Sequence, residues 1–252
     1  MSLVDTNWLE KNINQVKIID CSWHMPTENR NPEEEFKKEH IPSAIFFDLD
    51  KNSKKDTDLP HMLPSSNEWN KIVSNLGISK EDHVIIYDNS NVISSCRCWY
   101  NFIYFGHDPK LVSVLDGGFR KWKQENKKIS NEIIKFSKTN YTGQELTSLV
   151  KDKVKINNNI SKNEFVVIDS RSKERFDGKV PDPRKNVRSG SIPNSICLPF
   201  MQVINEDYSF KNAAELKSLF ENTLEKPTDK PVFSCGSGVT ACVLALAYSL
   251  VN

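Results

Sequence analysis

The 252-residue sequence has no long apolar run and no excess of charge of either sign. A membrane-spanning helix needs about 20 consecutive apolar residues, and no stretch approaches that length. The 34 lysines and arginines nearly balance the 33 aspartates and glutamates, so the overall charge does not indicate binding to nucleic acid or to a membrane surface. We therefore expect neither nucleic acid nor a membrane among the partners of this protein.

The sequence also lacks the usual marks of a targeting segment and of a metal site. Residues 1–10 contain Asp5 and Glu10 but no basic cluster and no apolar segment, which predicts a cytoplasmic protein, with a mitochondrial location as the alternative. Of the six cysteines, only Cys96 and Cys98 are close in sequence, and a single Cys-x-Cys makes a poor metal site. We expect no metal and no cofactor, and mostly reduced structural thiols.

What the sequence does contain is an internal repeat. In each half, one apolar stretch ends in an aspartate, at Asp20 or Asp169, and a second follows an Ile-Pro pair. A third apolar stretch ends at Asp88 in the first half and at Cys235 in the second, and each precedes a loop and an apolar helix. The predicted strands are 16–23, 44–49 and 83–88 in the first half, and 165–171, 195–200 and 231–235 in the second.

Short β-branched runs that alternate with helical patterns predict parallel sheets buried on both faces. The clearest helix covers residues 66–76, with Gly77 just past its end, and its counterpart is 212–220. The predicted fold class is α/β, with two tandem domains that each have helices on both faces of a parallel sheet. We expect the first domain at 1–136, a connector at 137–163 that enters the second domain as a surface loop at residues 157–159, and the second domain within 148–252.

Cys235 begins the run Cys235-Gly236-Ser237-Gly238-Val239-Thr240. A lone cysteine at a strand end is more often a small core residue than a nucleophile, but three features favour a nucleophile here. The position is the carboxyl edge of a parallel sheet, where such folds bind ligands. The two glycines allow backbone N–H groups to converge on an anion, and the dipole of the following helix favours a thiolate. Because the first half has Asp88 at this position, we expect only the second half to be chemically active.

This loop resembles the active-site loop of 3-mercaptopyruvate sulfurtransferases of the two-domain rhodanese family. The resemblance extends over HIPSAIFFDLD (40–50), HMLP (61–64), LDGGFRKW (115–122) and DSRSKERFDGKVPDPR (169–184). It implies two tandem rhodanese-like domains and a sulfurtransferase that moves sulfur from 3-mercaptopyruvate to a thiol acceptor. The sulfur is carried as a persulfide of Cys235 and pyruvate is released. The expected acceptors are thioredoxin or small thiols.

The residues around the loop bear on the donor. Thiosulfate-type members of the family place cationic residues directly after the cysteine, whereas Gly236 and Ser237 are neutral, as in the mercaptopyruvate branch. The resemblance implies that Arg175 and Arg184 bind the substrate, and a guanidinium fork suits a carboxylate and its neighbouring keto oxygen. Arginines in a charged loop are usually solvated, and we expect this of Arg171 and of Arg188.

The resemblance further implies an Asp–His–Ser relay formed by Asp50, His61 and Ser237. Ser237 would pass a proton to the pyruvate enolate, with His61 behind it and Asp50 fixing the imidazole tautomer. Without the resemblance, His61 would be interpreted as an ordinary loop histidine.

Three other functions compete with this interpretation. A cysteine phosphatase needs an arginine about six residues after its nucleophile, and Ala241 stands there, which makes this the weakest rival. A thiosulfate sulfurtransferase would use the same cysteine. The third is a catalytically inactive rhodanese-like module that only binds partners.

The inactive alternative arises because the second half is shorter than the first. The first half continues beyond its apolar helix into a strand and turn at 111–118, and rhodanese-like folds place that strand between the first strand and the one before the loop. We therefore expect a truncated second domain that lacks the C-terminal strand and helix, with a gap inside its sheet or another segment in that slot. A smaller departure is Ser191, where the family usually has histidine and the first half has His40.

Overall fold

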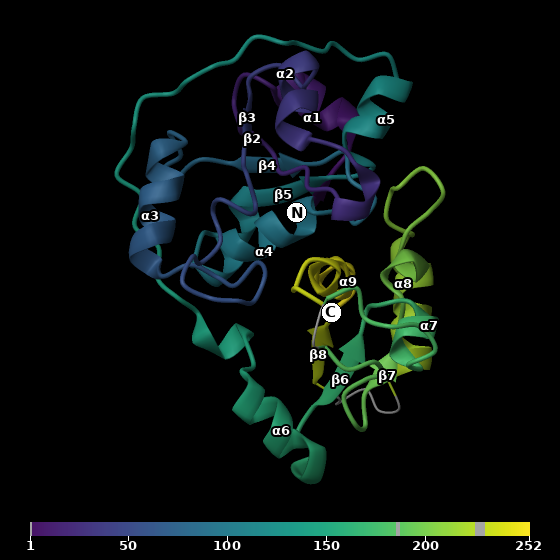
Figure 1. Ribbon diagram of the computed structural model, residues 1–252. Coiled ribbons are helices and arrows are strands. Elements are labelled where there is room, and N and C mark those ends of the chain that lie inside the picture. Colours follow the sequence, from purple (N-terminus) through teal and green to yellow (C-terminus); the bar gives the residue numbers. More distant parts are fainter. Residues whose placement is uncertain (1, 185–186, 225–229) are drawn as a thin grey trace. The chain divides into compact units, whose positions relative to one another are not determined.

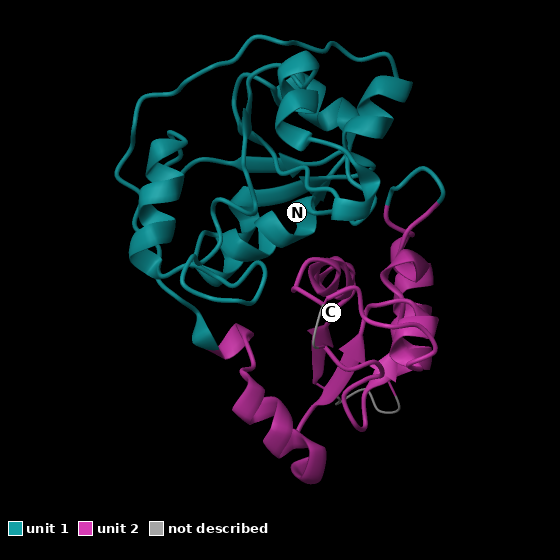
Figure 2. Ribbon diagram, in the orientation of Figure 1, with its two compact units in different colours: residues 1–147, 206–209 teal, residues 148–205, 210–252 magenta. Residues whose placement is uncertain are grey.

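The computed structural model describes residues 2–184, 187–224 and 230–252, which form two compact units (Figure 1). Unit 1 comprises Met1–Thr147 together with Glu206–Ser209, and unit 2 comprises Ser148–Asn205 and Phe210–Asn252 (Figure 2). The segment that follows residue 136 packs within unit 1, because Thr139 N donates to Ser74 O (3.0 Å) and Leu146 N donates to Tyr104 O (2.8 Å).

Unit 1 contains a five-stranded sheet in the order β1-β5-β4-β2-β3, in which every neighbouring pair is parallel. The order reverses between β2 and β4, so the carboxyl ends of these two strands form the switch point at which open α/β sheets bind ligands. In register, Asp20 at the end of β2 lies beside Tyr87 at the end of β4. The strands are β1 (Leu3–Val4), β2 (Lys17–Asp20), β3 (Ala44–Phe46), β4 (Val84–Tyr87) and β5 (Val112–Leu115).

Helices cover both faces of this sheet, with α1, α2 and α5 on one side and α3 and α4 on the other (Figure 1). The start and end signals of α3 are local: the Ser65 side chain accepts from Glu68 N, and Gly77 adopts a left-handed φ of 70° beyond the end of the helix. The α-helices of unit 1 are α1 (Thr6–Asn12), α2 (Pro32–Lys38), α3 (Ser66–Asn75), α4 (Ser95–Tyr104) and α5 (Gly118–Gln124). Their apolar faces contribute the fully buried Leu9, Trp69, Val73, Phe102 and Trp122 to the core.

Unit 2 contains a three-stranded parallel sheet in the order β7-β6-β8, which matches β3-β2-β4 of unit 1. Its strands are β6 (Val166–Asp169), β7 (Ile196–Cys197) and β8 (Pro231–Ser234), and its α-helices are α6 (Lys153–Lys162), α7 (Lys173–Phe176), α8 (Ala213–Thr223) and α9 (Thr240–Ser249). In the part of the chain that the structure describes, β8 pairs with β6 alone. The expectation of a truncated second domain stays a prediction.

The expectation of a surface loop at residues 157–159 is wrong, because these asparagines lie in α6. Asp152 caps the helix by accepting from Lys155 N (2.8 Å), and Asn163 ends it with a left-handed φ of 51°. Asn159 is 8% exposed and binds the chain that follows: its Nδ2 donates to Phe165 O and its Oδ1 accepts from Phe165 N. The side chain thus satisfies the backbone that leads into β6.

The predicted fold class is confirmed, since parallel sheets flanked by helices form both units. The second strand of each half is shorter than predicted, at three residues in β3 and two in β7. In the described residues, no helix is both long enough and apolar enough to cross a membrane.

Candidate active site

Cys235 lies directly beyond β8, at the carboxyl edge of the unit 2 sheet, where Ser234 is paired in register with Asp169 of β6. Its thiol is half-buried, and Gly238 N donates to Cys235 Sγ at 3.0 Å. Gly238 can aim its N–H back at the sulfur because it adopts a φ of 76°, which side-chain-bearing residues rarely accept. The loop therefore turns tightly around the sulfur atom.

The loop leads directly into α9, whose apolar side chains anchor it. Val243 and Leu244 have no exposed surface, and Thr240 Oγ1 lies 2.8 Å from Ser170 Oγ at the end of β6. Cys242 Sγ donates to Gly238 O at 3.1 Å, which ties the turn to the first turn of the helix. A buried helix thus begins at the loop with its positive end toward the loop.

The two predicted substrate-binding arginines are brought together by a third residue. Arg175 is in α7 and Arg184 follows nine positions later, and the Asp182 carboxylate lies between them. Arg175 Nη2 donates to Asp182 Oδ2 at 2.8 Å, and Arg184 Nε donates to Asp182 Oδ1 at 2.8 Å. These charge-assisted contacts hold the pKa of Asp182 well below its usual range, chiefly through the bond with Arg184.

Both guanidinium groups lie beside the Cys235 loop. Arg184 Nη1 donates to Gly236 O at 2.6 Å. A Cβ atom placed on Gly236 would be 3.7 Å from Nη2 of both Arg175 and Arg184, so the absence of a side chain at Gly236 leaves open the space in front of the two forks. Arg175 Nε is buried and has no hydrogen-bond partner among the described residues, which leaves one guanidinium donor unsatisfied.

The expectation that Arg171 is solvated is wrong, whereas Arg188 is exposed as expected. The Arg171 side chain is 11% exposed, and its Nη2 donates to Asp169 Oδ2 (2.6 Å) and to Gly190 O (2.8 Å). The Asp169 bond raises the pKa of Arg171, and the Cys235 sulfur also contributes to that rise. The Arg171 guanidinium, which is paired with Asp169, therefore also contributes to the electrostatic field around the sulfur.

Asp50 and His61 form a pair within unit 1. His61 Nε2 lies 2.8 Å from Asp50 Oδ1, and Trp23 Nε1 donates to Asp50 Oδ2 at 3.0 Å. The Trp23 ring also meets the imidazole edge-on at 4.9 Å, and the Arg97 guanidinium donates to His61 O. The hydrogen bond with His61 lowers the pKa of Asp50, so the carboxylate is ionised and oriented toward the ring. Ser237, the third residue of the expected relay, belongs to the Cys235 loop of unit 2.

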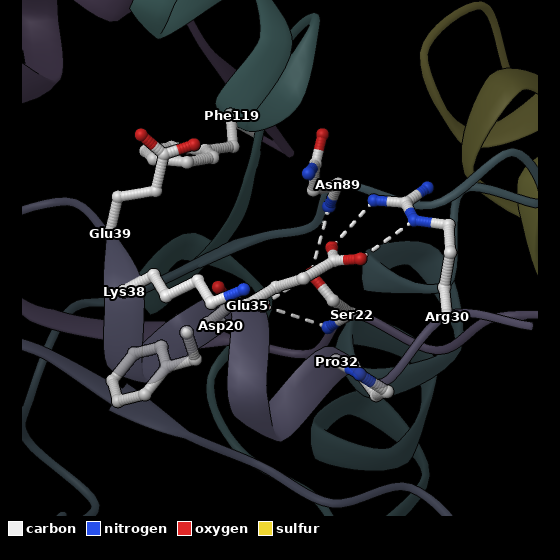
Figure 3. Close-up of a pocket in the computed structure, with 10 residues that line it drawn as sticks. Asp20, Ser22, Arg30, Pro32, Glu35, Lys38, Glu39, Asn89 and Phe119 are labelled. Carbon is white, nitrogen blue, oxygen red and sulfur yellow. Dashed lines mark hydrogen bonds and ion pairs between the residues drawn. The ribbon is translucent and has the colours of Figure 1, made fainter.

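At the equivalent place in unit 1, Asp88 takes the position of Cys235. It is 6% exposed and accepts from Ser90 Oγ (2.7 Å) and Ser95 N (3.0 Å). Beside it, a pocket of about 320 Å³ lies at the ends of β2 and β4. Its polar groups bond to one another, as the Arg30–Glu35 pair and the Ser22–Asp20 contact show (Figure 3).

Sequence reasoning missed Asp182 and the pairing of Asp169 with Arg171. A signal was present in both cases, because arginines at the buried edge of a sheet need counter-ions and each aspartate stands two positions before its arginine. Within the described residues, no group of three or more His, Cys, Asp or Glu side chains could hold a metal ion.

Comparison with known proteins places this geometry in a family. Residues 5–125 match the rhodanese-like domain. The chain is 40% identical to the Arabidopsis thaliana protein named thiosulfate/3-mercaptopyruvate sulfurtransferase 1, mitochondrial, over 97% of this chain and 70% of the relative. It is 36% identical to the Mus musculus 3-mercaptopyruvate sulfurtransferase, over 97% of this chain and 84% of the relative.

A solved structure agrees with the sequence relatives. SseA from Escherichia coli, described as having the rhodanese fold of 3-mercaptopyruvate sulfotransferases, superposes with a TM-score of 0.90 at 28% identity. The match covers 100% of this chain and 94% of SseA. The sequence and fold comparisons agree over nearly the whole length, and the chain belongs to the rhodanese family of sulfurtransferases.

Proposed function

We propose that this protein transfers sulfur from 3-mercaptopyruvate to a thiol acceptor through a persulfide on Cys235. The observation that supports this most directly is the Cys235 loop itself. It presents a half-buried sulfur that accepts an N–H bond from Gly238, with the forks of Arg175 and Arg184 beside it at Gly236. A nucleophile next to a carboxylate-binding pair suits a small mercapto-acid.

The chemistry has two halves. The Cys235 thiolate attacks the sulfur of the donor, the carbon–sulfur bond breaks, and its electron pair remains on the organic fragment as the pyruvate enolate. Protonation of the enolate carbon gives pyruvate and leaves a persulfide on Cys235. The thiolate of the acceptor, thioredoxin or a small thiol, then attacks the outer sulfur. The sulfur–sulfur bond breaks and the Cys235 thiolate is restored.

We infer that Ser237 takes part in the protonation of the enolate, and that Asp50 and His61 assist it. In support of this role, His61 Nε2 lies 2.8 Å from Asp50 Oδ1, and Trp23 Nε1 donates a hydrogen bond to the second oxygen of the same carboxylate. An imidazole fixed in this way can hold or pass on a proton in a defined orientation.

A single-turnover experiment tests the proposal. The reduced protein is mixed with stoichiometric 3-mercaptopyruvate in the absence of an acceptor, and pyruvate is measured alongside the intact mass. We expect one pyruvate per chain and a mass increase of one sulfur atom on the peptide that contains Cys235. Cys242→Ser, which alters a nearby thiol in α9, is the matched control and should still form the persulfide. A chain that releases no pyruvate, or that carries the sulfur on another cysteine, would contradict the proposal.

A further inference from the structure

Asp182 is the most enclosed charged group near the Cys235 loop. Its side chain is 1% exposed, whereas the side chains of Arg175 and Arg184 are 25% and 34% exposed. Asp182 Oδ2 accepts from Nη2 of both arginines, at 2.8 and 3.1 Å, and Oδ1 accepts from Arg184 Nε and Arg184 N. Both carboxylate oxygens therefore bond to the arginine pair.

These contacts fix how the two forks point. With its Nε and Nη2 edge held by Asp182, Arg184 extends Nη1 to Gly236 O. The Nη2 atoms of both arginines reach the same position in front of Gly236. The shared carboxylate also offsets the repulsion between the two positively charged guanidinium groups.

The same carboxylate sets the charge of the site. Arg171, Arg175 and Arg184 carry three positive charges, and Asp169 and Asp182 carry two negative ones. Among these five groups, one positive charge is left in excess. Without Asp182 the excess would be two, and the attraction for an anion rises with the product of the charges.

We propose that Asp182 is a positioning residue that affects donor specificity: it limits the arginine pair to one net positive charge and so reduces the electrostatic advantage that a dianionic donor such as thiosulfate has over a monoanionic carboxylate donor. This inference rests on the proposed function. The neutral Gly236 and Ser237 act in the same direction from the loop side. Asp182 acts through its bonds to the two arginines, and we do not place it among the substrate-binding residues.

Asp182→Asn tests the proposal, because it keeps the size of the side chain and removes its charge. We expect the ratio of kcat/KM for 3-mercaptopyruvate to kcat/KM for thiosulfate to fall by about tenfold, after allowance for solvent screening. The change should appear mainly in KM, with a lower KM for thiosulfate. Asp182→Glu restores the charge and should restore most of the ratio.

Asp177→Asn is the matched control. Asp177 belongs to the same loop region and pairs with Lys173 and Lys179, not with the arginines. It should leave the ratio within about twofold of the wild type, since an exposed ion pair contributes little. An unchanged ratio in Asp182→Asn, an equal loss for both donors, or an equal shift in Asp177→Asn would each overturn the proposal.

A binding measurement on the wild-type protein and on Asp182→Asn keeps the test independent of turnover. Alkylation of Cys235 by iodoacetamide is followed in the presence of pyruvate, a monoanion, or sulfate, a dianion. We expect Asp182→Asn to lower the protecting concentration of sulfate by a larger factor than that of pyruvate, and an equal change for both anions would overturn the role of Asp182. If pyruvate protects but 3-mercaptopyruvate yields no persulfide, the proposed function fails and the inference about charge stands.

Discussion

The loops after β4 and β8 occupy the same position in the two units, and they differ in how their first residue is surrounded. Asp88 is 6% exposed, accepts bonds from Ser90 and Ser95, and is covered by α5, where a Cβ on Gly118 would lie 2.5 Å from Asp88 O. Cys235 is half-buried and receives an N–H bond from Gly238. A repeat can thus keep its strand–loop–helix geometry while one copy satisfies the loop internally and the other leaves a reactive atom accessible.

The strands that lead into these loops differ in the same way. All four residues of β4 are fully buried, between β2 and β5, whereas all four residues of β8 are only partly buried. The more enclosed copy contains the carboxylate, and burial raises the pKa of Asp88. Tight packing and the proposed chemical activity therefore lie in different copies of the repeat.

The largest effect is expected when the thiol is moved from the loop of unit 2 to the equivalent loop of unit 1. Cys235→Ser should reduce sulfur transfer by about a thousandfold or more, because a serine hydroxyl cannot form a persulfide. Adding Asp88→Cys to that variant should restore none of the activity, since the new thiol would lie under α5. Single-turnover pyruvate release and intact mass measure both effects. A persulfide detected at position 88 would show that the sequence of the loop, and not its surroundings, separates the two units.

The aspartates at the ends of β2 and β6 allow a second comparison between the units. Asp169 neutralises the largely buried Arg171, and Asp169→Asn leaves that charge without its counter-ion. We expect the free energy of unfolding of unit 2 to fall by about 3 to 4 kcal/mol. Urea unfolding followed by fluorescence measures the loss, and Asp169→Asn combined with Arg171→Met should recover part of it. No recovery in the double variant would mean that the pair does not account for the loss.

Asp20 is the counterpart of Asp169 in unit 1. Among the described residues no cation bonds to it, and it instead accepts from Ser22. Burial raises the pKa of Asp20 from 3.8 to about 6. Its stabilising contribution is therefore complete below about pH 4 and is lost as the pH rises through about 6. Relative to Asp20→Asn, the wild-type unit 1 should lose about 2 to 3 kcal/mol of unfolding free energy between pH 4 and pH 7.

Urea titrations of both proteins at several pH values test this prediction. A difference between wild type and Asp20→Asn that does not change with pH would contradict it. The same titrations on Asp169→Asn give the contrast between the units, because loss of the ion pair with Arg171 should make that variant less stable than the wild type.

The smallest expected effect concerns the residue after each loop's first position, Asn89 in unit 1 and Gly236 in unit 2. Gly236→Ala should raise the KM for 3-mercaptopyruvate about fivefold with little change in kcat, because the added methyl would touch both guanidinium groups at ordinary contact distance. Steady-state kinetics measure the split. A fall in kcat with an unchanged KM would indicate that the methyl disturbs the sulfur and not the arginine pair.

The repeat, the fold class and most elements could be predicted because their signals are local. The helix expected at 66–76 is α3, since Ser65, Glu68 and Gly77 encode its start and end within a short local stretch. The asparagines of α6 were misinterpreted because their polarity suggested a loop. The role of Asn159 depends on Phe165, which lies outside the helix.

The candidate site was predictable only in part for the same reason. Cys235 follows from its strand, its glycines and its helix, whereas Arg175 and Arg184 needed the resemblance to the family. Their assembly depends on the buried Asp182 and on the bond from Arg184 to Gly236, which is distant in the sequence, and no periodic pattern predicts such contacts. The departure of Arg171 from its expected exposure has the same origin.

The four residues Glu206–Ser209 lie late in the chain, yet they belong to unit 1. Arg120 stacks 3.9 Å above the Tyr208 ring, and Lys121 pairs with Asp207 at 3.0 Å. No single cut in the polypeptide can separate the two units intact: a fragment that ends at residue 147 omits a piece of its own surface. Expression of either half by itself would therefore yield a damaged unit, and dissection of this protein calls for a graft of 206–209 onto the first half.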